Sequence, residues 1–162
     1  MILVVCGVSG TGKSTIGRLL AKAFSLPFYD ADDFHSTANI QKMGRGISLT
    51  DEDRKPWLDF LADNIALWEG KSGAVLACSA LKETYRVILS SKCSTDIDWV
   101  YLVGSETILL DRLASRQGHF FNPLLLGSQL AALELPEDSC CFDVTPPPSE
   151  IVNSIVAALK HK

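Results

Sequence analysis

Long apolar runs and an excess of basic residues are both missing from this chain of 162 residues. No stretch approaches the roughly 18 apolar residues that a membrane-spanning helix needs, so a transmembrane protein is not expected. Fifteen Lys and Arg against nineteen Asp and Glu give a net charge of −4. Proteins that coat nucleic acids or bind membrane surfaces normally carry a basic excess, so neither partner is expected. Small anionic substrates stay open, because arginines can gather in one cleft whatever the net charge is.

Cysteine pairs with metal-binding or redox spacing are missing as well. The five cysteines are an odd number and include no Cys-x-x-Cys. Cys6 and Cys78 lie within apolar runs, where a reduced cysteine acts as a small hydrophobic residue. This pattern favours a reducing, cytoplasmic compartment. The apolar run at 2–6 lacks a basic start and ends at Gly7, so it predicts a buried strand rather than a signal peptide.

Internal repeats, low-complexity segments and compositional shifts that would mark a linker are absent. Residues 1–162 are therefore expected to form a single domain, and a hydrophobic fraction of 47% is enough for one core. What is present is an alternation of short apolar runs and segments with helical spacing. Strands are expected at 2–6, 28–30, 74–78, 99–103 and 140–144. Helices are expected at 13–24, about 50–69, 82–89 and 105–114, and after the three prolines at 146–148.

This alternation predicts an α/β three-layer sandwich in which a five-stranded, mainly parallel sheet is flanked by helices. Thr50 and Asp53 have the spacing of a capping box at the start of the second helix, and Pro56 indicates a break or a restart there. Ser149 is expected to cap the last helix. Ligands of such sheets bind beyond the carboxyl ends of the strands, so functional residues are expected directly after each strand.

The segment after the first strand, GVSGTGKS at 7–14, fits the phosphate-binding pattern G-x-x-x-x-G-K-[ST]. Its glycines allow a tight turn that aims backbone N–H groups at phosphate oxygens, at the positive end of the next helix. Lys13 can reach the β- and γ-phosphates of a nucleotide, and the Ser14 hydroxyl can bind Mg²⁺. An ordinary glycine-rich turn is disfavoured, because the strand before it and the helix after it are both predicted.

Two carboxylates, Asp30 and Asp32, follow the second predicted strand. Because they are two residues apart, they are expected to point to the same side of the chain. One can hold a Mg²⁺-bound water while the other accepts a proton from an acceptor hydroxyl. The alternative is a solvated acidic turn that caps a helix, and the phosphate-binding motif favours the catalytic interpretation.

Four arginines lie near helix ends or after strands on the predicted ligand side. Arg54 is near the start of the second helix, and Arg86 follows the third strand. Arg112 and Arg116 are four residues apart and precede a Gly- and Pro-bounded segment that suits a mobile lid. Each arginine alone is typical of a solvated helix face. Together they favour an anionic acceptor beside ATP, because arginine binds carboxylates and phosphates bidentately.

These blocks together resemble the gluconate kinases (gluconokinases). The matching segments occur in family order from residue 2 to about residue 136, as GVSGTGKST, FYDADDFH, NIQKMGRG, DEDRKPWL, ACSALKETYR and RQGHFF. The resemblance implies a P-loop fold like that of nucleoside monophosphate kinases. It also implies ATP-dependent phosphorylation of D-gluconate at its 6-hydroxyl, which gives 6-phosphogluconate for the pentose phosphate pathway. Mg²⁺ is implied as cofactor, and a homodimer is suggested.

The resemblance also implies roles for particular residues. Catalysis is expected from Lys13, Asp32 and Arg116. ATP binding is expected from Gly7, Ser9, Gly10, Thr11, Gly12, Lys13, Ser14, Thr15, Arg112 and Arg116. Acceptor binding is expected from a segment at about 32–57 and its partners, namely Asp32, His35, Lys42, Arg54, Arg86 and His119. The metal is expected at Ser14 and, through water, at Asp30. The lid is expected at about 115–131, and the adenine near 143–147.

Three other functions fit parts of the pattern. Shikimate kinases share the phosphate loop, an Asp-x-Asp and an anionic acceptor, but they predict Gly-Gly-Gly after the third strand. This chain has Ser79, Ala80 and Leu81 there. A nucleoside monophosphate kinase would need a site for a second base, and the sequence shows none. A nucleotide-dependent switch without catalysis is disfavoured by the presence of Lys13 and Asp32.

Overall fold

The computed structural model describes residues 1–115, 122–136 and 140–160. Its sheet has five strands, β1 (Ile2–Cys6), β2 (Phe28–Asp30), β3 (Ala74–Ala77), β4 (Asp98–Val103) and β5 (Cys140–Asp143). They lie in the order β2-β3-β1-β4-β5, and every neighbouring pair is parallel. The expected α/β fold with a parallel sheet is therefore confirmed.

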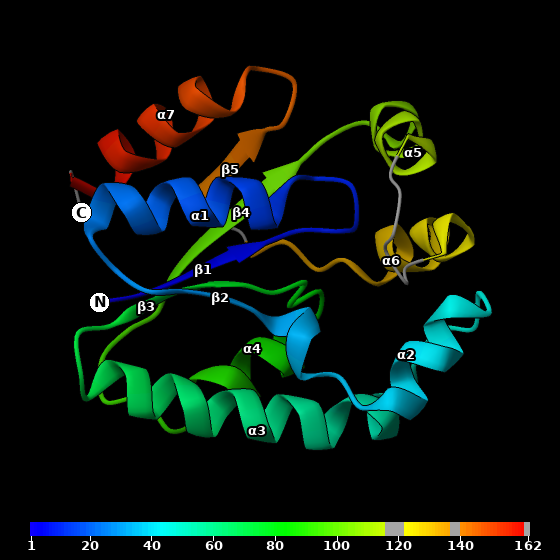
Figure 1. The fold of residues 1–162 in the computed structure, drawn as a ribbon, viewed down its shortest axis with the longest axis horizontal. Helices are drawn as coiled ribbons and strands as arrows, with labels where there is room; N and C mark the ends of the chain where they lie inside the picture. The colour runs from blue at the N-terminus through cyan, green and yellow to red at the C-terminus, as the bar shows by residue number, and fades with distance from the viewer. Residues whose placement is uncertain (116–121, 137–139, 161–162) are drawn as a thin grey trace.

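Helices cover both faces of the sheet (Figure 1). On one face lie α1 (Lys13–Phe24) and α7 (Pro148–Lys160), and on the other lie α3 (Asp51–Glu69) and α4 (Glu83–Ser90). The helices α2 (Thr37–Gly44), α5 (Glu106–Ala114) and α6 (Leu126–Ala132) lie toward the carboxyl ends of the strands. Two 3₁₀ turns, η1 (Ala31–Phe34) and η2 (Pro123–Leu125), precede α2 and α6.

The core consists of two apolar layers separated by the sheet. All of β1 is buried, and its side chains alternate between the layers. Ile2, Val4 and Cys6 pack with residues of α3 and α4, whereas Leu3 and Val5 pack with residues of α1 and α7. This alternation explains why the strand is continuously apolar in sequence, because both of its faces are covered.

The structure tests three local expectations about helix ends and breaks. The capping box is present, since the Thr50 side chain accepts from the Asp53 amide and Asp53 accepts from the Thr50 amide. No break occurs at Pro56, because α3 continues through it. The expected cap at Ser149 is wrong. The last helix begins at Pro148, whose fixed φ suits a first turn that has no use for an N–H.

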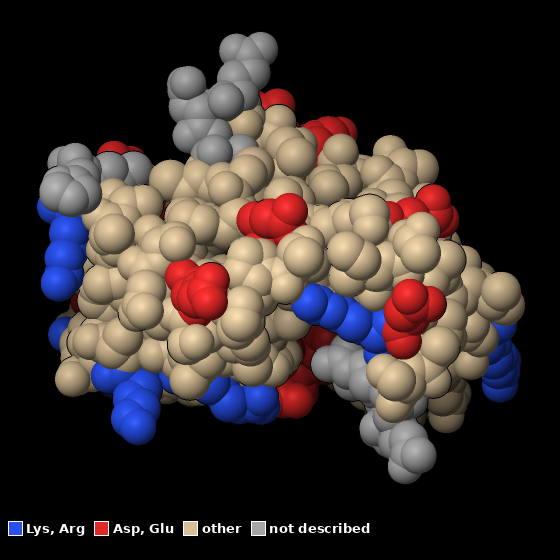
Figure 2. All heavy atoms as spheres, turned by 90° about the horizontal axis from the view of Figure 1, so that it is seen from above, with Lys and Arg blue, Asp and Glu red and all other residues tan. Residues whose placement is uncertain are grey.

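The surface carries charges of both signs. On the face drawn in Figure 2, acidic and basic side chains are interspersed among uncharged residues, and the described residues form no broad basic surface there. Within the described parts of the chain, no helix is long and apolar enough to cross a membrane.

Candidate active site

The phosphate loop at residues 7–14 joins β1 to α1 and contains three glycines with positive φ. Gly7, Gly10 and Gly12 have φ values of 139°, 86° and 88°. Residues with side chains rarely adopt these angles. A Cβ on Gly7 would also lie 2.6 Å from the carbonyl oxygen of Leu102 in β4. The loop therefore packs directly against the sheet, which fixes its amides at the N-terminus of α1.

Lys13 lies between this loop and the acidic residues that follow β2. Its Nζ donates a hydrogen bond to the carbonyl oxygen of Val8 at 3.1 Å. Burial lowers the pKa of Lys13, while the nearby carboxylates of Asp32 and Asp30 act in the opposite direction. The ammonium group of Lys13 therefore lies at the loop, where it could form an ion pair with a bound phosphate.

Asp30, at the end of β2, links this segment to α1. Ser14 Oγ donates to Asp30 Oδ2 at 2.5 Å, and the Asp32 amide donates to Asp30 Oδ1 at 3.1 Å. Because the Ser14 hydrogen points to Asp30, the lone pairs of the Ser14 oxygen remain available to a cation. A hydroxyl beside a carboxylate suits Mg²⁺, which usually takes few protein ligands and keeps several waters.

A pocket of about 270 Å³, called the nucleotide pocket below, lies beside the loop between α1 and α7. Arg112 of α5 reaches it, and its Nη2 donates to the carbonyl oxygen of Val144 at 2.6 Å. The pocket is lined by Gly10, Thr11, Gly12, Thr15, Ile16, Arg112, Val144, Pro146, Pro148 and Ile151. The expected ATP residues Gly10, Thr11, Gly12, Thr15 and Arg112 therefore lie together, with the segment after β5 as an apolar wall.

A smaller pocket of about 30 Å³, called the reaction pocket below, lies on another side of the loop. It brings together Lys13, Asp32, His35 and Arg54, which come from three segments of the chain, the start of α1, the turn after β2 and the start of α3. Its wall consists of Ser9, Lys13, Asp32, His35, Met43, Leu49, Arg54, Trp57, Ser79 and Gln129. The structure thus gathers three of the expected acceptor residues around the phosphate-binding lysine.

His35 is held as a neutral, buried imidazole. Its ring stacks on Trp57, with ring centroids 4.2 Å apart and an interplanar angle of 15°. Burial, followed by the charge of Arg54, lowers the pKa of His35 to about 4. Nε2 lies 4.0 Å from Asp32 Oδ1, and the buried Nδ1 has no hydrogen-bond partner among the described residues. Near neutral pH this ring can donate one hydrogen bond and accept another.

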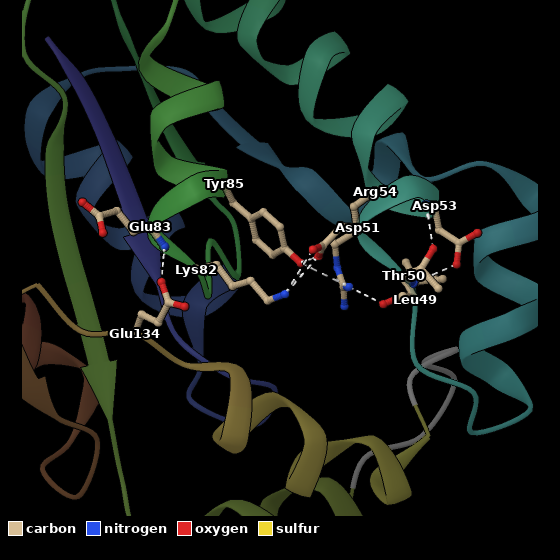
Figure 3. A network of polar contacts seen from close by, with 9 residues as sticks. All are labelled: Leu49, Thr50, Asp51, Asp53, Arg54, Lys82, Glu83, Tyr85 and Glu134. Atoms are coloured by element: carbon tan, nitrogen blue, oxygen red, sulfur yellow. Dashed lines mark hydrogen bonds and ion pairs between the residues drawn. The ribbon is translucent and has the colours of Figure 1, made fainter.

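A third pocket of about 260 Å³, called the distal pocket below, adjoins the reaction pocket and shares Leu49, Arg54 and Gln129 with it. Arg54 Nη1 donates to the carbonyl oxygen of Leu49 and, at 3.4 Å, to the Tyr85 hydroxyl (Figure 3). The distal pocket is lined by Ser48, Leu49, Thr50, Asp51, Arg54, Leu81, Lys82, Tyr85, Ser128, Gln129 and Ala132.

Two expected acceptor residues line neither of these two pockets. Lys42 of α2 forms an ion pair with Asp53, with 2.6 Å between Nζ and Oδ2. Arg86 is only 9% exposed, and its Nη1 donates to the carbonyl oxygens of Ala80 at 3.4 Å and Glu134 at 2.8 Å. The guanidinium of Arg86 therefore binds backbone carbonyl groups of two segments and does not line the acceptor pockets. The remaining expectations, Arg116 and His119, lie outside the described residues.

Other residues of these pockets were not expected from the sequence. Trp57, Lys82 and Tyr85 belong to the segments DRKPWL and ACSALKETYR, which resemble the gluconate kinases. The resemblance therefore indicated these segments, but no site role was assigned to the three residues. No sequence motif indicated that Gln129 belongs to the site. Its Oε1 accepts a hydrogen bond from the Ser9 amide of the phosphate loop at 2.8 Å, which joins α6 to the loop.

Known proteins are similar to this chain in sequence and in fold. A family model described as shikimate kinase matches residues 9–140. A gluconokinase of Arabidopsis thaliana is 41% identical over 171 residues, which cover 96% of this chain and 90% of the relative. A gluconokinase of Gluconobacter oxydans (strain 621H) is 46% identical over 140 residues, which cover 84% of this chain and 76% of the relative. The crystal structure of a gluconokinase from Sinorhizobium meliloti 1021 has a TM-score of 0.88 and 40% identity, and the match covers 99% of this chain and 91% of that one.

Proposed function

Because the chain belongs to the gluconokinase family of P-loop kinases, it phosphorylates gluconate with ATP, and we propose that the acceptor hydroxyl reacts in the reaction pocket beside Asp32. The observation that carries this proposal is the position of the phosphate loop between two pockets. Gly10 and Gly12 line the nucleotide pocket, whereas Ser9 and Lys13 line the reaction pocket. A γ-phosphoryl group held on the loop would therefore lie between the rest of the nucleotide and the acceptor hydroxyl.

ATP is proposed to bind with its phosphates on the loop amides and its base in the nucleotide pocket. The positive-φ glycines and the N-terminus of α1 support the first part, because both direct N–H groups at an anion. The apolar wall formed by Val144, Pro146 and Ile151 supports the second part. Arg112 and, outside the described residues, Arg116 are proposed to pair with the phosphates.

Mg²⁺ is proposed to bind at Ser14 and, through water, at Asp30. When bound, it would neutralise charge on the β- and γ-phosphates of ATP. The short Ser14–Asp30 contact of 2.5 Å supports this assignment, because Asp30 takes the hydroxyl hydrogen and orients the oxygen lone pairs outward.

Asp32 is proposed to accept the proton of the 6-hydroxyl. The hydroxyl oxygen forms a bond to the γ-phosphorus while the bond from that phosphorus to the bridging oxygen of ADP breaks. The proton passes to the Asp32 carboxylate, and Lys13 balances the charge of the transferred group. His35 and Arg54 are proposed to hold hydroxyls of gluconate. His119, outside the described residues, stays a prediction for the same site.

Arg86 and Lys42 are proposed to act through the fold instead. Arg86 holds the turn after β3 to the segment after α6 by its bonds to Ala80 and Glu134. Lys42 ties α2 to the start of α3 through Asp53. Both residues thus support the walls of the acceptor site without contacting gluconate.

Shikimate is the second acceptor to be tested, because the family model that matches residues 9–140 is described as shikimate kinase. The turn after β3 argues against it, since Ser79, Ala80 and Leu81 stand where shikimate kinases are expected to have three glycines. Ala80 even has a positive φ of 39°, so the bend is made here without glycine.

The acceptor is tested by ADP release from purified protein with Mg-ATP and one acceptor at a time. The panel consists of gluconate, shikimate, other six-carbon aldonates and AMP. Turnover is expected chiefly with gluconate. Equal turnover across the panel, or none with gluconate, would contradict the proposed acceptor site.

The partners of the protein are proposed to be gluconate and ATP alone, in the cytoplasm. The five cysteines are all free, which supports a reducing compartment. A homodimer remains a prediction, and light scattering behind size-exclusion chromatography measures it directly.

A further inference from the structure

The reaction pocket is too small to hold the whole acceptor. Its volume of about 30 Å³ accommodates about two water molecules, which is space for a reacting hydroxyl and its neighbouring carbon. A six-carbon chain must extend from it, and the distal pocket of about 260 Å³ continues from the same wall through Leu49, Arg54 and Gln129. If O6 reacts beside Asp32, the carboxylate at the other end of the chain lies in the distal pocket.

The charge of the distal pocket fits one carboxylate. Its lining contains two cations, Arg54 and Lys82, and one anion, Asp51, which leaves a net charge of +1. Arg54 stands where the two pockets meet and already donates to Leu49 and Tyr85. Lys82, which precedes α4, supplies the remaining cation of this lining, and its side chain is 32% exposed.

From this arrangement we propose that Lys82 is a specificity-determining residue that binds the carboxylate of gluconate, with Asp51 and Tyr85 as its positioning residues. The assignment rests on the proposed function, because it takes gluconate as the acceptor and Asp32 as the residue at its other end. It replaces the role expected for Arg86, which lies in the same segment but points beneath the cleft.

Contacts around Lys82 hold its ammonium group at the pocket. Nζ lies 3.0 and 3.3 Å from the two carboxylate oxygens of Asp51, and the Tyr85 hydroxyl donates to Asp51 Oδ1 at 2.5 Å. The Tyr85 ring also lies near two cations, with Lys82 Nζ at 5.5 Å and Arg54 Cζ at 5.6 Å from its centroid. Figure 3 shows these side chains converging from the starts of α3 and α4.

The ammonium group retains capacity for a second carboxylate. Lysine has three N–H donors, and Asp51 occupies at most two of them. The carboxylate of Asp51 repels a second anion, but the two cations outnumber it. The site therefore favours a monoanionic acceptor over a neutral polyol of the same length, and over an acid that carries a second carboxylate near Asp51.

The test compares Lys82→Met with wild type in steady-state kinetics, with gluconate and with glucitol, the corresponding polyol that lacks the carboxylate. We expect KM for gluconate to rise about tenfold, because a charge-assisted contact in a partly exposed site is lost. We expect kcat, KM for ATP and any turnover of glucitol to stay within about twofold. Lys82→Arg should restore most of the gluconate affinity, because it keeps the positive charge. A merely structural defect would also change the turnover of glucitol, whereas a lost carboxylate contact would not.

Lys92→Met is the matched control. Lys92 forms an ion pair with Asp63 of α3, and both side chains are exposed, at 49% and 60%. It therefore joins the same two regions of the fold without lining either acceptor pocket. An unchanged KM for gluconate in Lys82→Met, or an equal rise in Lys92→Met, would overturn the role of Lys82 and leave the proposed function standing. Absence of gluconate turnover by wild type would overturn both.

Discussion

At the scale of single residues, Asp32 is the proposed proton acceptor. It lies in the reaction pocket with Lys13 and His35, and its backbone is fixed by the hydrogen bond from its amide to Asp30. Asp32 therefore lines the acceptor side of the phosphate loop, and its backbone is bonded to Asp30, a proposed water-mediated metal ligand.

Replacing Asp32 by Asn should lower kcat by about 10²–10⁴-fold, because the amide cannot accept the hydroxyl proton. The dissociation constant of ATP should stay within about twofold, since the loop is intact. Kinetics and nucleotide titration calorimetry measure the two quantities. Asp33→Asn is the matched control, as Asp33 is exposed and lines neither pocket. Equal losses in kcat and ATP affinity for Asp32→Asn would refute the role of the base.

His35 should make the free energy of unfolding depend on pH. Its folded pKa of about 4 lies below the ordinary value of 6.5, so the unfolded chain binds a proton that the folded chain does not between these values. The stabilisation is complete above pH 6.5 and is lost as the pH falls towards 4, by about 3 kcal/mol in total. The groups facing the ring are Arg54, which opposes protonation, and the carboxylate of Asp32.

Urea unfolding between pH 7 and pH 4.5 measures this effect. The free energy of unfolding of wild type should fall more steeply with decreasing pH than that of His35→Asn. Parallel pH profiles for the two proteins would show that His35 titrates normally and is not desolvated as described.

The sequence indicated the positions of residues in local motifs, but it did not indicate the direction of the Arg86 side chain. Lys13, Ser14 and Asp30 are set by a loop and a strand end, so their neighbours follow from the chain itself. The direction of Arg86 depends on how α4 is rotated against the sheet. Successive residues of a helix differ by about 100°, so Tyr85 reaches the cleft while Arg86 turns beneath it.

At the scale of the elements, two helical glycines differ in their surroundings. A Cβ on Gly17 of α1 would lie 2.6 Å from Cε2 of Phe28 in β2, whereas a Cβ on Gly127 of α6 meets nothing within 4 Å. Gly17 thus allows α1 to approach the edge of the sheet, and this approach positions the phosphate loop. Gly127 has no such function.

The two alanine variants should therefore change stability in opposite directions. Gly17→Ala should lower the free energy of unfolding by about 1–2 kcal/mol, because the clash outweighs the gain in helix propensity. Gly127→Ala should leave it unchanged or raise it by up to about 1 kcal/mol. Urea unfolding curves of both variants provide the comparison. A stabilised Gly17→Ala would show that α1 does not pack this closely.

The helix at 13–24 was predicted from the sequence, whereas α2 and α6 were not. The expected bounds of the helix at 13–24 agree with α1, because its apolar face repeats over three turns. α2 and α6 have eight and seven residues, and no helix was expected from the sequence at either place. Contacts with distant segments hold them, as in the bond from the Ser9 amide to Gln129 and the one from Ser48 Oγ to Ser128 Oγ at 3.0 Å.

At the scale of the whole molecule, the net charge of −4 conceals local cationic sites. Lys13, Arg54 and Lys82 line the two acceptor pockets, and Arg112 lines the nucleotide pocket. Overall charge bears only on large partners such as nucleic acids, and it does not show where a small anion binds. Sequence periodicity also could not predict the strand order β2-β3-β1-β4-β5, because this order depends on the crossovers between strands.

The orientation of gluconate across the two acceptor pockets is the central claim, since it places O6 at Asp32 and the carboxylate near Lys82. Nuclear magnetic resonance of the product tests it most directly, because coupling between phosphorus and carbon identifies the phosphorylated position. Coupling to C6 of gluconate, in an amount equal to the ADP released, is the predicted result. Coupling to another carbon, or ADP release without a phosphorylated acid, would contradict it.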